Sequence, residues 1–219
     1  IDAFLDDYAF LSWGLLELYE ATSDARWLSE AKRLMTQALP LFWDDAAGGL
    51  FLSGTKNETL IAKTKELYDG AIPSGNSVAA LVLVRLSQLT MDEAMQDKAN
   101  RLIEAFSGEV TRTPHAFPQF LIALDGWLGP SQEIVIAGDP ESPATRQMLE
   151  HVHRRFLPRA AVVFHPPGDA GQAIESLIPF VAKQVPFNGQ PTAYLCENYL
   201  CKLPTTDLDQ FQTQLDAIR

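Results

Sequence analysis

The sequence predicts a mainly α-helical protein whose chain ends in a small α/β subdomain. Three observations lead to this fold class. Apolar residues recur at helical spacing up to Trp127, the helical part contains an internal repeat, and short apolar strands flank a helix after Gly129. We therefore expect helical hairpins over residues 1–128 and an α/β (β-α-β) subdomain, packed on them, over residues 129–219.

Five helices are expected in the first part. The apolar stripe of the first helix consists of Phe4, Tyr8, Leu11, Leu15 and Leu18. The segment Thr22-Ser23-Asp24 separates it from the second helix, because short polar side chains cap free backbone N–H groups. Thr90 and Glu93 have the spacing of a capping box before the fourth. The second helix is expected to carry Trp27 to Ala38 on one face and to end near Pro40, and the third to start between Ser74 and Ser77 and to run through Leu89. The fourth and fifth are expected over residues 93–106 and 117–127.

A shift of 68 positions places the second pair of helices on the first. Seven identities follow from this shift: Leu15/Leu83, Leu18/Leu86, Thr22/Thr90, Asp24/Asp92, Ala31/Ala99, Arg33/Arg101 and Leu34/Leu102. A helical hairpin cannot bury its apolar face alone, so we expect the repeated hairpins to stack in a solenoid or a closed ring. The alternative is that two similar hairpins arose by chance.

After Gly129 the pattern becomes β-α-β. Apolar strands are expected over 134–137 and 161–164, on either side of a helix over 142–156 that Ser142 caps. Such a crossover makes the two strands parallel. A third strand over 192–195 and a final helix over 206–218 complete this part.

The charge balance excludes two classes of partner. The chain has 17 basic and 28 acidic residues, a net charge of -11 and a pI near 4.7. A field of this sign repels nucleic-acid phosphates and anionic lipids. No apolar run has the length of a membrane span and no signal segment opens the chain, so we expect a cytoplasmic protein that binds neither nucleic acid nor membranes. Because Ile1 stands directly before a helical pattern, we also expect the chain to begin in mid-protein.

Two polar segments, 5–8 and 69–77, stand at equivalent places in the repeat, each at the start of a helix. Equivalent positions in a closed ring face the same rim, so the two segments are expected to share one pocket. Asp6 and Asp7 diverge by about 100° on a helix, and we expect Asp7 to face the pocket and Asp6 to be a cap.

A pocket of this composition favours a sugar or another small polar ligand, because hydroxyl groups need carboxylate and amide partners and sugar faces stack on aromatic rings. Paired carboxylates can also supply an acid and a base. The expected catalytic residues are Asp7, Glu66 and Asp69, and the expected ligand-binding residues are Tyr8, Lys65, Tyr68, Ser74 and Asn76. The alternative is structural, since Asp, Asn and Ser before helices are common caps and turn residues.

Cys196 and Cys201 are the two cysteines of the chain, too few for a closed four-cysteine zinc site. They could be buried thiols, a local disulfide or a redox pair, and buried thiols are the expectation for an intracellular chain. His151 and His153 cannot share a helical face, and no nucleotide-binding loop or nucleophile elbow is present. We therefore expect neither a metal nor a cofactor.

Three segments resemble one protein family: residues 5–9, residues 65–77, and residues 191–196 followed by Cys201. The family is that of the thioredoxin-domain-containing proteins related to spermatogenesis-associated protein 20, and the resemblance spans essentially all 219 residues. It implies a thioredoxin-like N-terminal domain joined to an (α/α)6 toroid of the six-hairpin glycosidase and N-acylglucosamine 2-epimerase type. This chain would be the C-terminal part, a partial toroid followed by the α/β subdomain. Its partners would then include the missing N-terminal half and thioredoxin-like domain of the same protein.

The resemblance implies two functions. The first is a carbohydrate-binding or carbohydrate-active toroid, similar to sugar epimerases or glycosidases. The related epimerases use a pair of histidines, whereas His115 is the only histidine in this helical part. The second function is a non-catalytic scaffold for a thioredoxin-like redox domain. A third hypothesis makes Cys196 and Cys201 a working dithiol, and whether the protein is an enzyme stays open.

Overall fold

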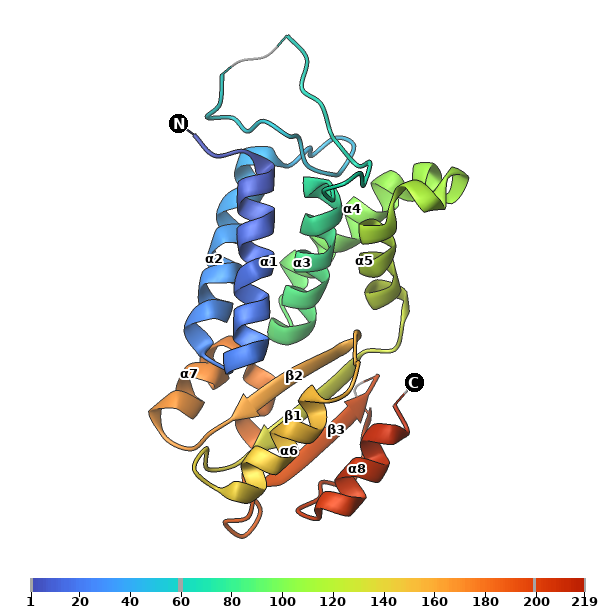
Figure 1. Cartoon of the computed structure of the whole chain (residues 1–219). Helices are drawn as coiled ribbons and strands as arrows, with labels where there is room; N and C mark the ends of the chain where they lie inside the picture. Colours follow the sequence, from blue (N-terminus) through green and yellow to red (C-terminus); the bar gives the residue numbers. More distant parts are fainter. Residues whose placement is uncertain (1, 59–60, 199, 219) are drawn as a thin grey trace. The chain divides into compact units, whose positions relative to one another are not determined.

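The computed structural model describes residues 2–58, 61–198 and 200–218 (Figure 1). The chain divides into two compact units, Ile1–Leu128 and Gly129–Arg219. The first unit is helical, and the second combines helices with a four-stranded sheet. A mainly α-helical protein with a small mixed sheet is therefore confirmed.

The helical unit is built on α3, which packs against α1, α4 and α5, while α1 also packs against α2. Its helices are α1 (Leu5–Thr22), α2 (Ala25–Phe42), α3 (Gly75–Thr90), α4 (Glu93–Arg112) and α5 (Pro118–Leu128), with a 3-10 turn η1 (Pro114–Ala116) before α5. The side chains of Val78, Val82 and Leu86 on α3 are completely buried. In Figure 1, α1, α3 and α5 form a row and begin at the same end of the unit.

The backbone of the helical unit bears out the internal repeat. Both α1 and α3 end at equivalent threonines, Thr22 and Thr90, whose hydroxyls donate to the carbonyl four residues earlier at 2.6 and 2.8 Å. The residue after each threonine is left-handed, with φ of 56° and 52°. Asp24 and Asp92 then cap α2 and α4 by accepting hydrogen bonds from backbone N–H groups. Asp92 thus starts α4, in place of the capping box expected from Thr90 and Glu93.

The α/β unit contains the predicted β-α-β crossover. Its elements are β1 (Gln132–Ala137), α6 (Pro143–His153), β2 (Ala160–His165), α7 (Asp169–Leu177), the 3-10 helix η2 (Pro179–Lys183), β3 (Thr192–Glu197), β4 (Leu200–Cys201) and α8 (Leu208–Asp216). The strand order is β2-β1-β3-β4. β1 and β2 are parallel as expected, whereas β3 runs antiparallel to both β1 and β4, so the sheet is mixed.

One face of this sheet carries the core of the α/β unit. Ile134 and Ile136 of β1 and Leu195 of β3 pack there with Met148 of α6 and Phe211 of α8. Successive side chains of a strand point to opposite faces, so the alternate residues of β1 and β3 face the other side of the sheet. Glu133 and Cys196 belong to that other side.

Three elements of the α/β unit, α7, η2 and β4, were not predicted from the sequence. These elements are short, and a helix of nine residues after Gly168 gives little periodic signal. β4 has two residues, fewer than any strand pattern needs. The expected cap of α6 is also wrong in one respect, because the Ser142 side chain makes no capping hydrogen bond.

Candidate functional site

The loop between α2 and α3 is fastened to the starts of three helices. Its described residues, 43–58 and 61–74, bond to α1, α3 and α5 in or beside their first turns. At α1, the backbone N–H of Leu5 donates to the loop carbonyl of Leu52 at 3.1 Å. The two polar segments that were expected to be neighbours therefore lie at one end of the helical unit, which we call the helix-start end.

Asp69 connects the starts of α3 and α5. Its carboxylate is buried, and Oδ2 accepts hydrogen bonds from the backbone N–H groups of Gln119 (2.9 Å) and Phe120 (3.1 Å) in the first turn of α5. Oδ1 accepts from the N–H of Ser74, the N-cap of α3, at 2.9 Å. A carboxylate satisfies N–H groups that a helix start leaves free and lies favourably at the positive end of the helix dipole. Both oxygens of Asp69, expected to be catalytic, thus serve as caps.

Asn76, expected to bind ligand, is completely buried and binds the loop instead. Its Nδ2 donates to the carbonyls of Leu50 (2.9 Å) and Glu66 (2.8 Å), and its Oδ1 accepts from the N–H of Leu50 at 2.8 Å. Both hydrogen bonds that the Asn76 amide nitrogen donates therefore go to backbone carbonyls. Asn76 holds two separate stretches of the loop against α3.

Lys65 and Ser74, two further residues expected to bind ligand, also make internal bonds. The Nζ of Lys65 lies 2.6 Å from Oδ2 of Asp44 and donates to the carbonyl of Gly48 at 2.5 Å. The Lys65 hydrogen bond lowers the pKa of the Asp44 carboxyl. The Oγ of Ser74 accepts from the N–H of Ser77 at 3.1 Å, which caps α3. Lys65 therefore braces the loop, and Ser74 fixes the helix start.

The structure reverses the expected orientations of Asp6 and Asp7. Asp7 is the cap, since its Oδ2 accepts from the N–H of Phe4 at 2.8 Å. Asp6 leans toward α3 so closely that a Cβ on Gly75 would collide with its Oδ1. Burial raises the pKa of Asp6, and the negative charges of Glu66 and Asp7 raise it further. Asp6 is therefore the carboxyl group that faces the second polar segment.

Three of the expected site residues, Glu66, Tyr68 and Tyr8, remain at least partly at the surface. Glu66 is exposed, and Tyr68 has 69% of its surface exposed. Tyr8 is half-buried, with its ring edge-to-face against Phe42 at a centroid distance of 5.6 Å. Glu66 and Tyr68 are therefore accessible to a ligand, whereas the Tyr8 ring is partly covered by Phe42.

Gln119 was not singled out from the sequence. It lies in the first turn of α5 and is buried, and its Nε2 has no hydrogen-bond partner among the residues that the structure describes. A buried amide donor without a partner is rare in folded proteins. Glutamine after proline gives no sequence signal for such a position.

Within residues 2–58, 61–198 and 200–218, no group of three or more His, Cys, Asp or Glu side chains could hold a metal ion. No helix in this part of the chain combines the length and the apolar character needed to cross a membrane. His115 lies exposed in η1.

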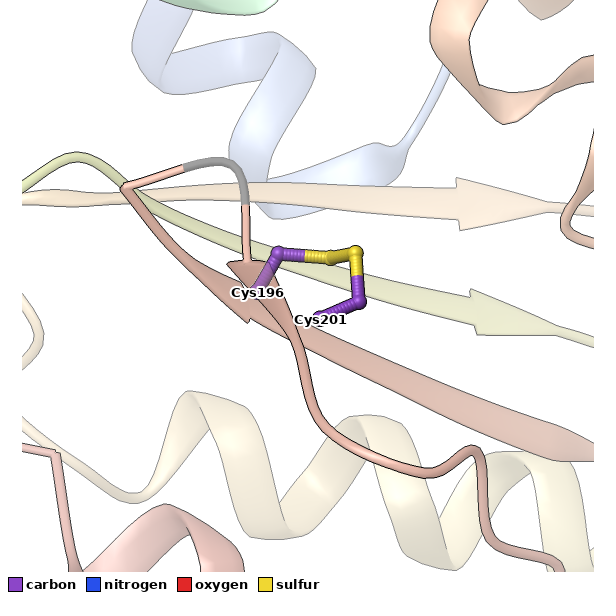
Figure 2. The surroundings of a disulfide bond; sticks show 2 residues. All are labelled: Cys196 and Cys201. Atoms are coloured by element: carbon purple, nitrogen blue, oxygen red, sulfur yellow. A yellow bond between two sulfur atoms is a disulfide. The ribbon is translucent and has the colours of Figure 1, made fainter.

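A second notable site lies in the α/β unit, where Cys196 of β3 and Cys201 of β4 form a disulfide (Figure 2). The expectation of buried thiols is therefore wrong, and the local disulfide is the alternative that the structure contains. The two residues are directly paired, with a Cα–Cα distance of 3.9 Å. Cys196 is buried and Cys201 is exposed. A disulfide that closes so short a loop stabilises the fold by only about 2 kcal/mol.

The strand β3 lies between β4 and β1, and its Cys196 is paired with Glu133 of β1 as well as with Cys201 of β4. Directly paired residues of neighbouring strands share one face, so Glu133, Cys196 and Cys201 form a row across three strands. Glu133 is only 8% exposed, and its Oε2 has no hydrogen-bond partner within the described part of the chain. Burial raises the pKa of its carboxyl group. From the sequence, Glu133 is simply the polar residue before an apolar strand.

Comparison with known proteins gives close relatives, although no family model matches the sequence. The chain is 38% identical to spermatogenesis-associated protein 20 of Homo sapiens over 205 residues, which are 93% of this chain and 26% of that protein. The protein of the same name from Rattus norvegicus gives the same identity and coverage. An uncharacterized protein of Caenorhabditis elegans is 28% identical over 212 residues, 97% of this chain and 28% of its own length.

The chain spans about a quarter of the length of these curated relatives. The matches extend over nearly the whole chain, so they include both the helical unit and the α/β unit. They confirm the resemblance carried by the polar segments and the cysteine pair. The chain is therefore a homologue of spermatogenesis-associated protein 20.

Proposed function

We propose that the helical unit is part of an (α/α)6 toroid that binds a carbohydrate at the helix-start end. The observation that carries this proposal is the approach of Asp6 to Gly75 and Glu66. It brings carboxyl groups from two distant segments to the end where α1, α3 and α5 begin. The C-terminal position of the chain in a larger, cytoplasmic protein with a thioredoxin-like domain is part of the same proposal. The greater length of the relatives supports its first element, that the chain is part of a larger protein.

The chemistry of this end suits a ligand rich in hydroxyl groups. Carboxylates accept hydrogen bonds from hydroxyls, and the exposed ring of Tyr68 offers a face on which a sugar can stack. The raised pKa of Asp6 favours a protonated carboxyl group beside the exposed Glu66. A protonated acid next to a second carboxyl group is the arrangement that glycosidases use as an acid and base.

The predicted site residues divide into two groups in this proposal. Glu66 remains a candidate catalytic residue, and Asp6 joins it as the proton-bearing partner. Asp7 and Asp69, also expected to be catalytic, support the helix starts through their capping bonds. Lys65, Ser74 and Asn76 hold the loop in place, and Tyr8 and Tyr68 provide aromatic surface.

Calorimetry with a panel of monosaccharides and disaccharides tests the proposal on the 219-residue chain and on the full-length protein. A sugar that binds is expected to lose about tenfold or more in affinity in Asp6→Asn and Glu66→Gln, since hydrogen bonds to charged groups contribute about 1.5–3 kcal/mol. Glu58→Gln, in the same loop, is the matched control and should bind as the unmodified chain does. Binding by neither protein, or equal losses in all three variants, would reject the proposal.

A scaffold without catalysis is the second candidate, and a separate observation favours it. Lys65, Asp69, Ser74 and Asn76 all make bonds within the protein, as a structural brace would. In this case Asp69→Ala lowers the melting temperature of the full-length protein while the chemistry of its thioredoxin-like domain stays unchanged. Sugar binding that depends on Asp6 and Glu66 would contradict the scaffold.

A further inference from the structure

The α/β unit carries a site that is independent of carbohydrate binding. We propose that Cys196 and Cys201 form a thiol–disulfide exchange site in which Glu133 exchanges a proton with Cys196. Its substrate is a dithiol, or the corresponding disulfide, of another molecule. Three observations support this proposal: the row of three side chains, the unequal exposure of the two cysteines, and the buried carboxyl group.

The three residues lie side by side on three neighbouring strands. Cys201 is paired with Cys196, which is paired with Glu133. The N–H of Lys202 donates to the carbonyl of Leu195, which makes the adjacent Cys196–Cys201 pair a non-hydrogen-bonded one, the pair type in which side chains approach most closely. The Cα atoms of the cysteines are 3.9 Å apart, and Figure 2 shows the disulfide joining the two arms of the β3–β4 hairpin.

The two sulfur atoms differ in access. Cys201 is exposed on β4, a two-residue strand at the edge of the sheet, whereas Cys196 is buried with 5% of its surface exposed. An incoming thiolate must reach a sulfur atom to displace the other one. The Sγ of Cys201 is therefore the atom that an external thiolate attacks, and Cys196 is the buried leaving group.

Glu133 supplies what a buried leaving thiolate requires. Directly paired residues have Cβ atoms about 4.5–5.5 Å apart, which places the carboxyl group within reach of Cys196. A buried carboxyl group has a large desolvation cost, and the interactions of this one with Ser131 and with its own backbone do not outweigh the effect of burial on its pKa. Because its pKa is raised, this carboxyl group holds its proton more tightly than an exposed carboxyl group does.

The exchange balances in atoms and electrons. An external thiolate attacks Sγ of Cys201, the bond between the two cysteines breaks, and Cys196 leaves as a thiolate that takes the proton of Glu133. A second thiolate of the same dithiol then displaces Cys201 from the mixed disulfide. Two electrons pass from the external dithiol to the cysteine pair. In the reverse direction Glu133 accepts the proton of Cys196 as this residue attacks the mixed disulfide.

The test uses the folded, oxidised 219-residue chain with dithiothreitol, quenched by alkylation and read by mass spectrometry. We expect reduction without unfolding, and a rate about tenfold lower in Glu133→Gln, because a positioned proton donor contributes at least this much. Glu197→Gln is the matched control, since Glu197 follows Cys196 and faces the opposite side of the sheet. Circular dichroism melting curves verify that each variant is folded.

Single-cysteine variants test which sulfur is attacked. With oxidised glutathione, Cys196→Ser should form a mixed disulfide at Cys201 about tenfold faster than Cys201→Ser forms one at Cys196, because the thiolate of the exposed residue has free access. Equal rates would overturn the proposal. So would a disulfide that is reduced only after unfolding, or a folded Glu133→Gln variant that reacts as fast as Glu197→Gln. If Glu133→Gln does not fold, the test of Glu133 passes to Glu133→Asp, which keeps the carboxyl group and should react within about threefold of the unmodified chain.

Discussion

The carboxylate of Asp69 accepts a hydrogen bond from the backbone N–H of Gln119 at 2.9 Å, so a residue that precedes α3 caps α5. The same carboxylate accepts from Ser74 at the start of α3. Two helices that pack together thus share one capping group from a loop that also crosses the start of α1. The helix-start end therefore forms as a unit, since none of the three helix starts is complete without the loop.

Replacement of Asp69 should be strongly destabilising. Asp69→Ala leaves three backbone N–H groups without their acceptor, and we expect a loss of about 2–4 kcal/mol in the free energy of unfolding. Urea denaturation measures this loss. Asp139→Ala is the control, because Asp139 caps a single N–H group in an exposed turn. A loss of less than about 1 kcal/mol for Asp69→Ala would show that the shared cap is unimportant.

Asn76→Asp tests the brace on α3 with almost no change of shape. The substitution removes the two N–H donors that bind Leu50 and Glu66 and buries a carboxyl group. We expect a loss of about 3 kcal/mol or more in the free energy of unfolding. Asn100→Asp keeps the oxygen that accepts from Trp127 and should change this free energy by less than about 0.5 kcal/mol. Similar effects of the two substitutions would contradict the assigned role of Asn76.

Gly75→Ala tests the close approach of Asp6 to α3. A Cβ at this position collides with Oδ1 of Asp6 and crowds Leu5, so we expect a loss of about 1–3 kcal/mol. Gly108→Ala, in the C-terminal part of α4 with open space around it, should instead stabilise the fold by about 0.5–1 kcal/mol. Thermal melting compares the two. In the Asp6→Ala background the penalty at Gly75 should shrink, and an undiminished penalty would place the collision elsewhere.

The pKa of Asp6 predicts a pH dependence of stability. Because this pKa is raised above 3.8 in the folded state, the folded protein binds the proton more tightly than the unfolded chain. Asp6 therefore reduces stability as the pH rises from about 3.8 through the folded pKa. Asp6→Asn should remove this decline and be the more stable protein at neutral pH. Denaturation curves at pH values from about 3 to about 8 measure this decline in both proteins.

Glu66→Gln should lower the pKa of Asp6, since the charge of Glu66 is one cause of the upward shift. Carbon-13 NMR of the Asp6 carboxyl group follows the titration directly. An unchanged titration in Glu66→Gln would mean that the two groups do not interact, and it would weaken the proposed acid and base pair. Glu58→Gln again serves as the control.

Glu133→Gln separates stability from function in the α/β unit. The pKa of Glu133 is raised above 4.5, so its ionisation at higher pH reduces the stability of the folded state. The variant should therefore melt at a higher temperature than the unmodified chain at neutral pH, although thiol–disulfide exchange slows. A lower melting temperature would instead identify Glu133 as a structural residue.

The local patterns predicted most of the elements correctly. Local sequence patterns located seven helices (α1 to α6 and α8) and three strands (β1 to β3), and the 68-residue repeat located the matching ends of α1 and α3. The polar segments were correctly expected to meet at one end of the helices. Orientation within that end was harder to predict: Asp7 was expected to face the second segment, and Asp6 does so instead. Asp6 and Asp7 are neighbours on α1 whose side chains point in different directions. Which of the two faces the second segment depends on where α3 packs against α1.

Composition, spacing and capping chemistry by themselves determined the helices, the repeat and the crossover, because these features depend on residues close together in the chain. Only the tertiary structure decided which polar groups are used internally. Asp69 reaches α5, Asn76 reaches the loop, and Glu133 lies beside Cys196 through contacts between distant segments. A carboxyl or amide group has the same appearance in a sequence whether it caps a helix or faces a ligand. Its role depends on the partners that folding brings to it.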